Sequence, residues 1–182
     1  MNGETTAVAI GLLSVSDRAS AGEYEDRGVP AMREWLQKTL SSPWRSREAV
    51  VADDFAAICA ILKTMIDEDG CRLVLTSGGT GPAPRDVTPE ATRAVADREI
   101  PGFGEEMRRV NLRYAPTAIL SRQIAASRGR ALIVNLPGQP KAVGETLDGI
   151  FSAVPYCMEL LGAPGLCTNP EVLAAFRPKS AR

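Results

Sequence analysis

The chain of 182 residues contains no histidine. Ser-His-Asp and Cys-His nucleophilic catalysis both use an imidazole as the general base, so the sequence excludes these two mechanisms. Histidine-based zinc sites are excluded for the same reason. Any catalysis would therefore have to work through other side chains and through backbone amides.

A surplus of charge of either sign is also lacking. The chain carries 21 basic and 22 acidic side chains, a net charge of −1, and it has no basic run. Such a balance provides no long-range field that would hold DNA or RNA. We therefore expect no nucleic-acid partner.

Long hydrophobic runs are missing as well. The longest apolar stretches, such as Val8–Val15 and Ala131–Leu136, are far shorter than the roughly 20 residues that cross a bilayer. The segment Met1–Glu4 lacks the basic start and apolar run of a secretory signal. The four cysteines form no C-x-x-C pair, so reduced thiols are the simplest interpretation. We expect a cytoplasmic protein without membrane contact.

The remaining composition is that of a globular protein, with 45% apolar and 24% charged residues. The length suits one sizeable core and is short for two ordinary domains. Because the sequence shows no internal repeat, low-complexity segment or linker, we predict a single domain over residues 1–182.

Short β-type runs alternate with stretches of helical periodicity, which predicts an α/β fold with parallel strands joined by crossover helices. The predicted strands are Ala7–Val15, Glu48–Ala52, Arg72–Thr76 and Ala131–Leu136. The predicted helices begin near Pro30, Asp53 or Asp54, Thr88, Gly104, Thr117 and Pro140.

Several helix boundaries are predicted from capping residues. Asp53 or Asp54 can cap the helix that follows, and Thr88 is the expected cap of the next one. Thr117–Ser127 has helical spacing, although Ala118–Leu120 is compatible with a strand. The last helix runs towards Leu161, with Pro155 as a candidate interruption, and a surface tail follows it.

Polar residues gather at the ends of the four predicted strands. These strand-end segments are Ser14–Arg18, Asp53–Asp54, Thr76–Gly81 and Asn135–Gln139. In open parallel sheets, ligands bind beyond the carboxyl ends of the strands. We therefore expect all four segments to line one cleft.

The glycine-rich loop, residues 78–81, is the sharpest of these features. Its glycines let backbone N–H groups turn inward towards an anion, and Thr80 adds a hydroxyl donor. No Gly-Lys-Ser/Thr follows, and Pro82 and Pro84 prevent direct entry into a helix, so neither the Walker A motif nor the dinucleotide fingerprint fits. A tight turn without a ligand stays open as an alternative.

Two aspartates accompany this loop. Asp86 lies at its end and Asp53 follows the second strand. Magnesium is usually held by one or two carboxylates together with substrate phosphates. The two aspartates and the loop therefore favour a nucleotide–magnesium site over a metal site built from protein alone. Taken singly, Asp53 also fits a helix cap, and Asp17 and Asp86 also fit ordinary loop residues.

The motifs taken together resemble the molybdopterin adenylyltransferases of the MogA type. The resemblance covers nearly the whole chain and rests on the combination of segments Ser14–Gly22, Thr76–Gly81, Arg85–Thr92, Ile100–Gly104, Pro116–Arg122, Leu136–Pro140 and the tail Phe176–Arg182. It implies a three-layer α/β/α sandwich with a mainly parallel sheet, assembled as a homotrimer.

The resemblance also implies a reaction of molybdenum cofactor biosynthesis. ATP and molybdopterin would give adenylylated molybdopterin and pyrophosphate with Mg²⁺, and the product would pass to a molybdate-inserting partner enzyme. The attacking terminal phosphate of molybdopterin is already anionic at neutral pH, so the chemistry needs no histidine base. The task is to align two polyanions and to neutralise their charge.

Residue roles follow from the same resemblance. Asp53 and Asp86 are the implied catalytic and magnesium-binding acids. The implied substrate-binding residues are Ser16, Asp17, Thr76, Ser77, Gly78, Gly79, Thr80, Gly81, Ser121, Asn135, Pro137, Gly138 and Gln139.

Two other functions compete with the transferase. A non-catalytic pterin-binding or scaffold module could share the fold, and the presence of both Asp53 and Asp86 speaks against it. A nicotinamide-dependent Rossmann enzyme would need a glycine fingerprint after its first strand. That strand ends in Ser-Val-Ser-Asp-Arg instead.

Overall fold

The middle layer of the molecule is a six-stranded sheet. In the computed structural model, which describes residues 7–179, its strands are β1 (Val8–Val15), β2 (Trp44–Val51), β3 (Leu73–Ser77), β4 (Arg98–Glu99), β5 (Ala125–Arg128) and β6 (Ala131–Leu136). Their order is β2-β1-β3-β6-β5-β4. β2, β1, β3 and β6 pair in parallel, whereas β5 and β4 extend the sheet in antiparallel fashion. The predicted, mainly parallel sheet is confirmed.

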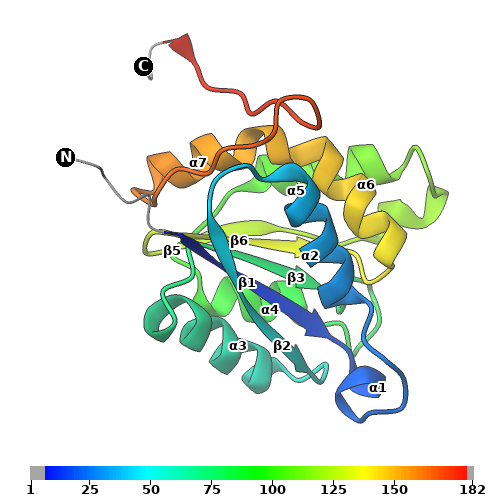
Figure 1. Cartoon of the computed structure of the whole chain (residues 1–182). Coiled ribbons are helices and arrows are strands. Elements are labelled where there is room, and N and C mark those ends of the chain that lie inside the picture. Colours follow the sequence, from blue (N-terminus) through cyan, green and yellow to red (C-terminus); the bar gives the residue numbers. More distant parts are fainter. Residues whose placement is uncertain (1–6, 180–182) are drawn as a thin grey trace.

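Helices form the two outer layers (Figure 1). They are α1 (Asp17–Ser20), α2 (Gly28–Thr39), α3 (Phe55–Lys63), α4 (Thr88–Val95), α5 (Pro101–Asn111), α6 (Pro140–Ile150) and α7 (Val154–Leu160). α2, α5, α6 and α7 cover one face of the sheet, and α3 and α4 cover the other. The three-layer α/β/α sandwich is therefore confirmed. None of the helices described is long and apolar enough to cross a membrane.

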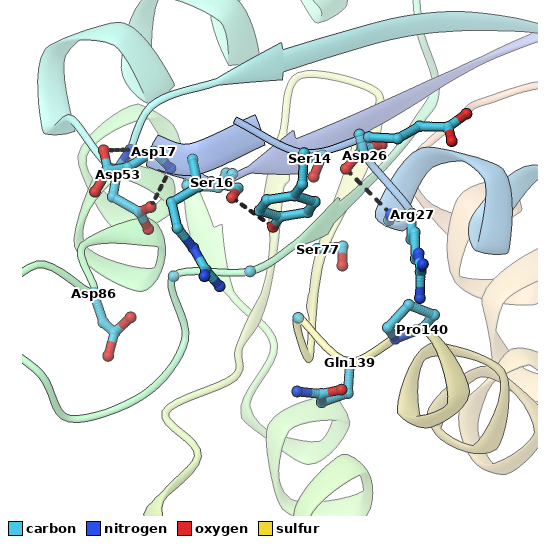
Figure 2. A pocket seen from close by; sticks show the side chains of 18 residues that line it. Ser14, Ser16, Asp17, Asp26, Arg27, Asp53, Ser77, Asp86, Gln139 and Pro140 are labelled. Carbon is cyan, nitrogen blue, oxygen red and sulfur yellow. Dashed lines mark hydrogen bonds between the residues drawn. The ribbon is translucent and has the colours of Figure 1, made fainter. Parts of the chain in front are cut away.

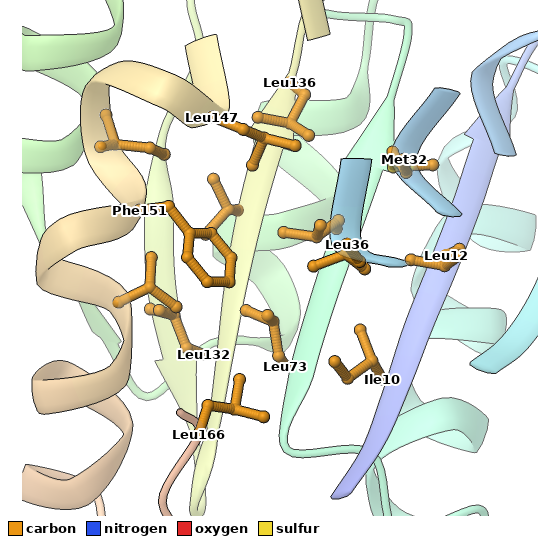
Figure 3. Packing of buried hydrophobic residues seen from close by; sticks show 14 of the residues in the cluster. Ile10, Leu12, Met32, Leu36, Leu73, Leu132, Leu136, Leu147, Phe151 and Leu166 are labelled. Carbon is orange, nitrogen blue, oxygen red and sulfur yellow. The ribbon is translucent and has the colours of Figure 1, made fainter. Parts of the chain in front are cut away.

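Two apolar cores hold the layers together. All eight residues of β1 are buried, as the continuous apolar run of a strand covered on both faces requires. On the face covered by α2 and α6, Leu36, Leu73 and Phe151 belong to one buried cluster (Figure 3). On the opposite face, Leu62 and Val74 belong to the second. The buried strands give the polar loops at their ends a rigid base.

The strand order places a crevice at the carboxyl ends of β1 and β3. The chain passes from β1 to β2 on one side of the sheet, and then returns through α3 to β3 on the other side of β1. Ligands bind outside the strand ends at such a reversal of strand order. The loops after Val15 and Ser77 leave the sheet at this point.

The predicted helix over Thr117–Ser127 is wrong. Pro116–Leu120 forms a short 3-10 turn, and Ala125–Arg128 is β5, which pairs antiparallel with β6. Ala125 and Ala126 are fully buried in this pairing. The alanines of this segment are spaced as in a helix, but pairing with β6 makes Ala125–Arg128 a strand. The two-residue strand β4 was not predicted.

Two further boundaries differ from the prediction. β2 spans Trp44–Val51 and is longer than the predicted Glu48–Ala52, because a polar edge strand carries little apolar signal. The last helix is interrupted by a 3-10 turn at Phe151–Ala153, and Pro155 lies in the first turn of α7. Proline fits that position because it needs no N–H partner there.

The C-terminal tail runs over the molecule with almost no regular structure. It touches the end of α2 through a bridge between Leu40 and Thr168, and Leu166 is fully buried in the core. The tail therefore adds apolar packing. The last residues of the family-like tail, Ser180–Arg182, lie outside the described residues, as does Met1–Glu4.

Candidate active site

A cleft of about 880 Å³ opens at the carboxyl ends of β1 and β3 (Figure 2). It is lined by the loops after β1, β2 and β3 and by the turn between β6 and α6. Of the residues predicted to form the site, those that line it are Ser16, Asp17, Asp53, Ser77, Gly78, Gly79, Asp86, Gly138 and Gln139. The four strand-end segments therefore converge as the sequence predicts.

A second groove, of about 360 Å³, adjoins the cleft. The predicted site residues that line it are Thr80, Gly81, Ser121, Pro137 and Gln139. Most of its wall is apolar and includes Tyr114 and Leu120. Because Gln139 lines both cavities, the polar cleft and this apolar groove meet at the turn before α6.

Two predicted binding residues, Thr76 and Asn135, line neither cavity. Both are fully buried, and the side-chain amide of Asn135 donates hydrogen bonds to Thr76 Oγ1 at 3.1 Å and to Thr92 Oγ1 at 2.9 Å. These bonds join β3, β6 and α4 beneath the cleft. The two side chains serve packing between these elements, which corrects the expectation that they contact substrate.

The turn after β3 requires glycine at two consecutive positions. Gly78 and Gly79 have φ angles of 103° and 63°, a region that disfavours other residues. A Cβ atom on Gly78 would overlap the carbonyl oxygen of Val15, and one on Gly79 would overlap the hydroxyl of Thr88. The backbone therefore comes as close to β1 and α4 as sterics allow.

Thr88 holds this turn in place. Its hydroxyl donates to the carbonyl oxygen of Gly78 at 3.0 Å, and its N–H donates to the carbonyl oxygen of Gly79 at 3.1 Å. The prediction that Thr88 caps α4 is wrong. Thr88 is the first residue of the helix, and the cap position belongs to Val87, which makes no side-chain cap bond.

Asp53 and Asp54 have separate roles. Asp54 caps α3, because its carboxylate accepts a hydrogen bond from the N–H of Ala57 at 2.7 Å. Asp53 instead accepts from the N–H of Asp17 at 3.0 Å, and the carboxylate of Asp17 accepts from the N–H of Asp53 at 3.1 Å. This reciprocal pair ties the end of β1 to the end of β2 and leaves Asp53 facing the cleft.

Asp86 is oriented by its own loop. Its Oδ2 accepts from the N–H of Ala83 at 2.9 Å, and its N–H donates to the carbonyl of the same residue at 2.9 Å. Within residues 7–179, the Oδ1 atoms of Asp53 and Asp86 accept no hydrogen bond, and no Arg or Lys pairs with either carboxylate. Such free carboxylate oxygens are the ligands that magnesium prefers.

The electrostatics of the cleft favour a cation beside Asp53. Burial raises the pKa of Asp53, the N–H of Asp17 opposes that rise, and the charges of Asp17 and Asp86 add to it. Arg85 offsets this only in part, since its ion-pair partner is Asp17. A partly desolvated carboxylate with like-charged neighbours is relieved by a bound cation.

The carboxylates do not make a complete metal site by themselves. In the part of the chain that the structure describes, no group of three or more Cys, Asp or Glu side chains could hold a metal ion. A magnesium ion held by Asp53 and Asp86 would therefore need phosphate oxygens and water for its other ligands. Nucleotide–magnesium sites are usually built in this way, so the residues present fit one.

Sequence reasoning missed Tyr24, which lines the cleft from the loop between α1 and α2. Its hydroxyl lies 2.9 Å from the hydroxyl of Ser16, and the Arg18 guanidinium lies 5.1 Å from the centre of its ring. This loop has no hydrophobic periodicity, so the sequence offers no signal that its aromatic ring reaches the site.

Arg27 was missed as well. It lies across the cleft from Asp53 and Asp86, beside Pro140 (Figure 2). Asp26 starts α2 by accepting from the N–H groups of residues 28 and 29, at 3.2 and 2.9 Å. Asp26 lies four residues before Pro30, near which the helix was predicted to begin, and an aspartate ahead of a helix is the one signal that could have placed this loop end.

The sequence matches a family described as the probable molybdopterin binding domain over residues 11–156. The chain belongs to this family. The matched range runs from β1 into α7, so it contains all four strand-end segments and both site aspartates.

Similar proteins of known function align with nearly the full length of this chain. The molybdopterin adenylyltransferase of Haemophilus influenzae is 54% identical over 190 residues, covering 98% of this chain and 96% of that protein. The molybdopterin adenylyltransferase of Escherichia coli is 56% identical over 185 residues, covering 95% of each. Among solved structures, the molybdopterin biosynthesis enzyme MoaB of Thermus thermophilus superimposes with a TM-score of 0.79 at 44% identity, covering 87% of this chain and 99% of that one.

Proposed function

We propose that this chain transfers the adenylyl group of ATP to molybdopterin, a step of molybdenum cofactor biosynthesis. An oxygen of the terminal phosphate of molybdopterin attacks the α-phosphorus of ATP. A new P–O bond forms, the bond from the α-phosphorus to the bridging oxygen breaks, and pyrophosphate leaves with the bonding electrons. The nucleophile is already anionic, so the absence of histidine is no obstacle.

The observation that carries this proposal is the composition of the cleft. A turn that requires glycine and two carboxylates with free oxygens face the same space. The relatives named as molybdopterin adenylyltransferases support the same conclusion, because they are more than half identical to this chain over nearly all of its length.

The polar cleft is suited to the phosphates. Because Gly78 and Gly79 have no side chains, the backbone of the turn lets a phosphate approach closely. The N–H of Gly78 already donates to the carbonyl oxygen of Leu136 at 3.4 Å, so the following amides of the loop would meet the anion. The N-terminal end of α6, at Gln139 and Pro140, adds partial positive charge at the rim of the cleft. These groups would align the two polyanions for in-line attack and exclude other orientations.

The apolar groove is suited to a flat heterocycle, and both substrates carry one. Tyr114, Leu120 and Pro137 provide apolar surface, and polar groups lie at one side. There the hydroxyl of Ser121 donates to Gln123 Oε1 at 2.7 Å. A ring in the groove would bring its phosphate end towards the adjoining cleft.

Asp53 and Asp86 are the residues that we expect to hold magnesium. When bound together with the substrate phosphates, the ion would neutralise the negative charge that develops on pyrophosphate. The reciprocal bonds with Asp17 fix the orientation of Asp53, and the bonds with Ala83 fix that of Asp86. The protein would thus present its carboxylates already oriented.

The assembly and cellular setting are part of the same proposal. The family resemblance supports a single domain over residues 1–182, a homotrimer, and hand-over of the adenylylated product to a molybdate-inserting enzyme. A cytoplasmic location agrees with the pathway. Size measurement of the purified protein by light scattering tests the trimer directly.

Incubation of the purified protein with molybdopterin, ATP and Mg²⁺ tests the function. We expect pyrophosphate and adenylylated molybdopterin, and we expect Asp53→Ala to abolish turnover while molybdopterin still binds. Removal of Mg²⁺ by EDTA should have the same effect on turnover. Molybdopterin binding without pyrophosphate release by the wild type would instead identify a non-catalytic pterin-binding module.

A further inference from the structure

Arg122 spans the loop that carries Asp86. Its Nε donates to the carbonyl oxygen of Gly81 at 2.7 Å, and its Nη2 donates to the carbonyl oxygen of Asp86. The backbone N–H of Arg122 also donates to the carbonyl oxygen of Thr80 at 2.8 Å. One residue therefore holds both ends of the segment from Gly81 to Asp86.

A carboxylate on α4 orients the guanidinium. Nη1 of Arg122 donates to Glu90 Oε1. Burial acts to raise the pKa of Glu90, but the hydrogen bond from Arg122, a backbone hydrogen bond and the charges of Arg122 and Arg93 together lower it. The guanidinium is thus directed at three acceptors on two elements. Its planar fork has donors in fixed directions, which a lysine ammonium does not offer.

Besides Arg122 and Thr88, two side chains tie the loop to the rest of the molecule: Arg85 forms an ion pair with Asp17, and Val87 packs against the core beneath α3 and α4. Residues 78–87 contain no helix or strand, and the two prolines supply no N–H donors. The bonds between Asp86 and Ala83 lie inside the segment, so they cannot fix it relative to the sheet. Thr88 holds the glycine turn at the start of the loop, whereas Arg122 holds the end that carries Asp86.

We propose that Arg122 is a positioning residue, which holds Asp86 and the end of the glycine-rich loop in the conformation that adenylyl transfer needs. It acts through backbone carbonyls and does not line the polar cleft. The expected effects on turnover and on its Mg²⁺ dependence rest on the proposed function. The arrangement of the loop can be measured without any turnover.

The test compares Arg122→Ala with Arg93→Ala. Arg93 lies on the same helix as Glu90 and makes two hydrogen bonds with Glu99, at 2.8 and 3.3 Å, and neither bond reaches the loop. We expect Arg122→Ala to lower kcat on the order of tenfold to a hundredfold, the size of effect that small misplacements of reacting groups produce. It should also raise the half-saturating Mg²⁺ concentration, whereas Arg93→Ala should change neither by more than about twofold.

A merely structural role would lower the melting temperature and the active fraction but leave the Mg²⁺ dependence unchanged. Arg122→Lys separates geometry from charge, because it keeps the attraction to Glu90 and loses the fork. It should retain the Mg²⁺ defect of the alanine variant. It also serves as the test variant if Arg122→Ala does not fold.

Hydrogen–deuterium exchange supplies the readout that needs no activity. Peptides covering Gly81–Val87 should exchange faster in Arg122→Ala than in Arg93→Ala, with the rest of the chain alike. If wild type makes no pyrophosphate, the proposed function fails, and exchange alone decides whether Arg122 holds the loop. Equal exchange in the two variants, or equal Mg²⁺ dependence where wild type is active, would overturn the inference.

Discussion

At the scale of single residues, the adjacent aspartates Asp53 and Asp54 have the same side chain but different roles. Asp54 is committed to the helix cap, while Asp53 faces the cleft with one oxygen free. The sequence could not separate them, because either fits the cap position. The pairing of β1 with β2, which brings Asp17 next to Asp53, decides between them.

The raised pKa of Asp53 predicts a pH-dependent stability. Because its folded pKa lies above the ordinary value of 3.8, ionised Asp53 opposes folding, and this cost grows as pH rises from about 4 through the folded pKa. Asp53→Asn should therefore raise the melting temperature at pH 7 without Mg²⁺. The difference from wild type should vanish at pH values below the ordinary pKa.

Asp54→Asn is the matched control for this measurement. Asparagine keeps the cap and removes the same charge from the neighbouring residue. Thermal unfolding of both variants at neutral and acid pH distinguishes a specific effect from one of net charge. A lower melting temperature for Asp53→Asn at pH 7 would contradict the assigned electrostatics.

At the scale of elements, the strands predicted correctly are those with strong apolar patterns. β1, β3 and β6 are mostly apolar and are buried along their whole lengths. β5 was missed because its alanines show no alternation of apolar and polar residues, and the segment is a strand through its pairing with β6. Arg122 was missed as a functional residue because its acceptors lie 41 and 36 positions away in the sequence.

The glycine turn gives a prediction at this scale. Gly79→Ala places a Cβ against the Thr88 hydroxyl in a left-handed conformation, so it should destabilise the fold by about 1–3 kcal/mol. It should also lower turnover, since the loop must shift. Chemical denaturation and the pyrophosphate assay measure the two effects.

Gly102→Ala is the control for Gly79→Ala. Gly102 lies in α5, and nothing lies within 4 Å of a Cβ added to it. Alanine is a better helix former, so the variant should be unchanged or more stable by up to about 1 kcal/mol. Equal behaviour of the two variants would remove the requirement for glycine in the turn.

At the scale of the whole molecule, the strand order brings the separate segments together. The carboxyl ends of β1, β2, β3 and β6 all reach the same edge of the sheet. This convergence follows from parallel pairing, so the sequence could predict it from strand ends alone. Thr76 and Asn135 belong to β3 and β6 themselves, and the hydrogen bonds of Asn135 to Thr76 and to Thr92 of α4 place them inside the protein rather than in the cleft.

The overall charge is also explained at this scale. A chain with a net charge of −1 can still bind polyanions, because the binding groups are local: backbone amides, a helix end and carboxylates that attract a cation. In the cleft, Asp53 and Asp86 lie on the side opposite Arg27, and Asp26 lies beside Arg27 (Figure 2).

The most direct test of this account is a crystal structure of the protein with ATP and Mg²⁺. We expect the triphosphate to lie against the Gly78–Gly79 turn, with the ion contacting Asp53 or Asp86. A nucleotide bound elsewhere on the molecule, or an ion that contacts neither aspartate, would contradict the central claim.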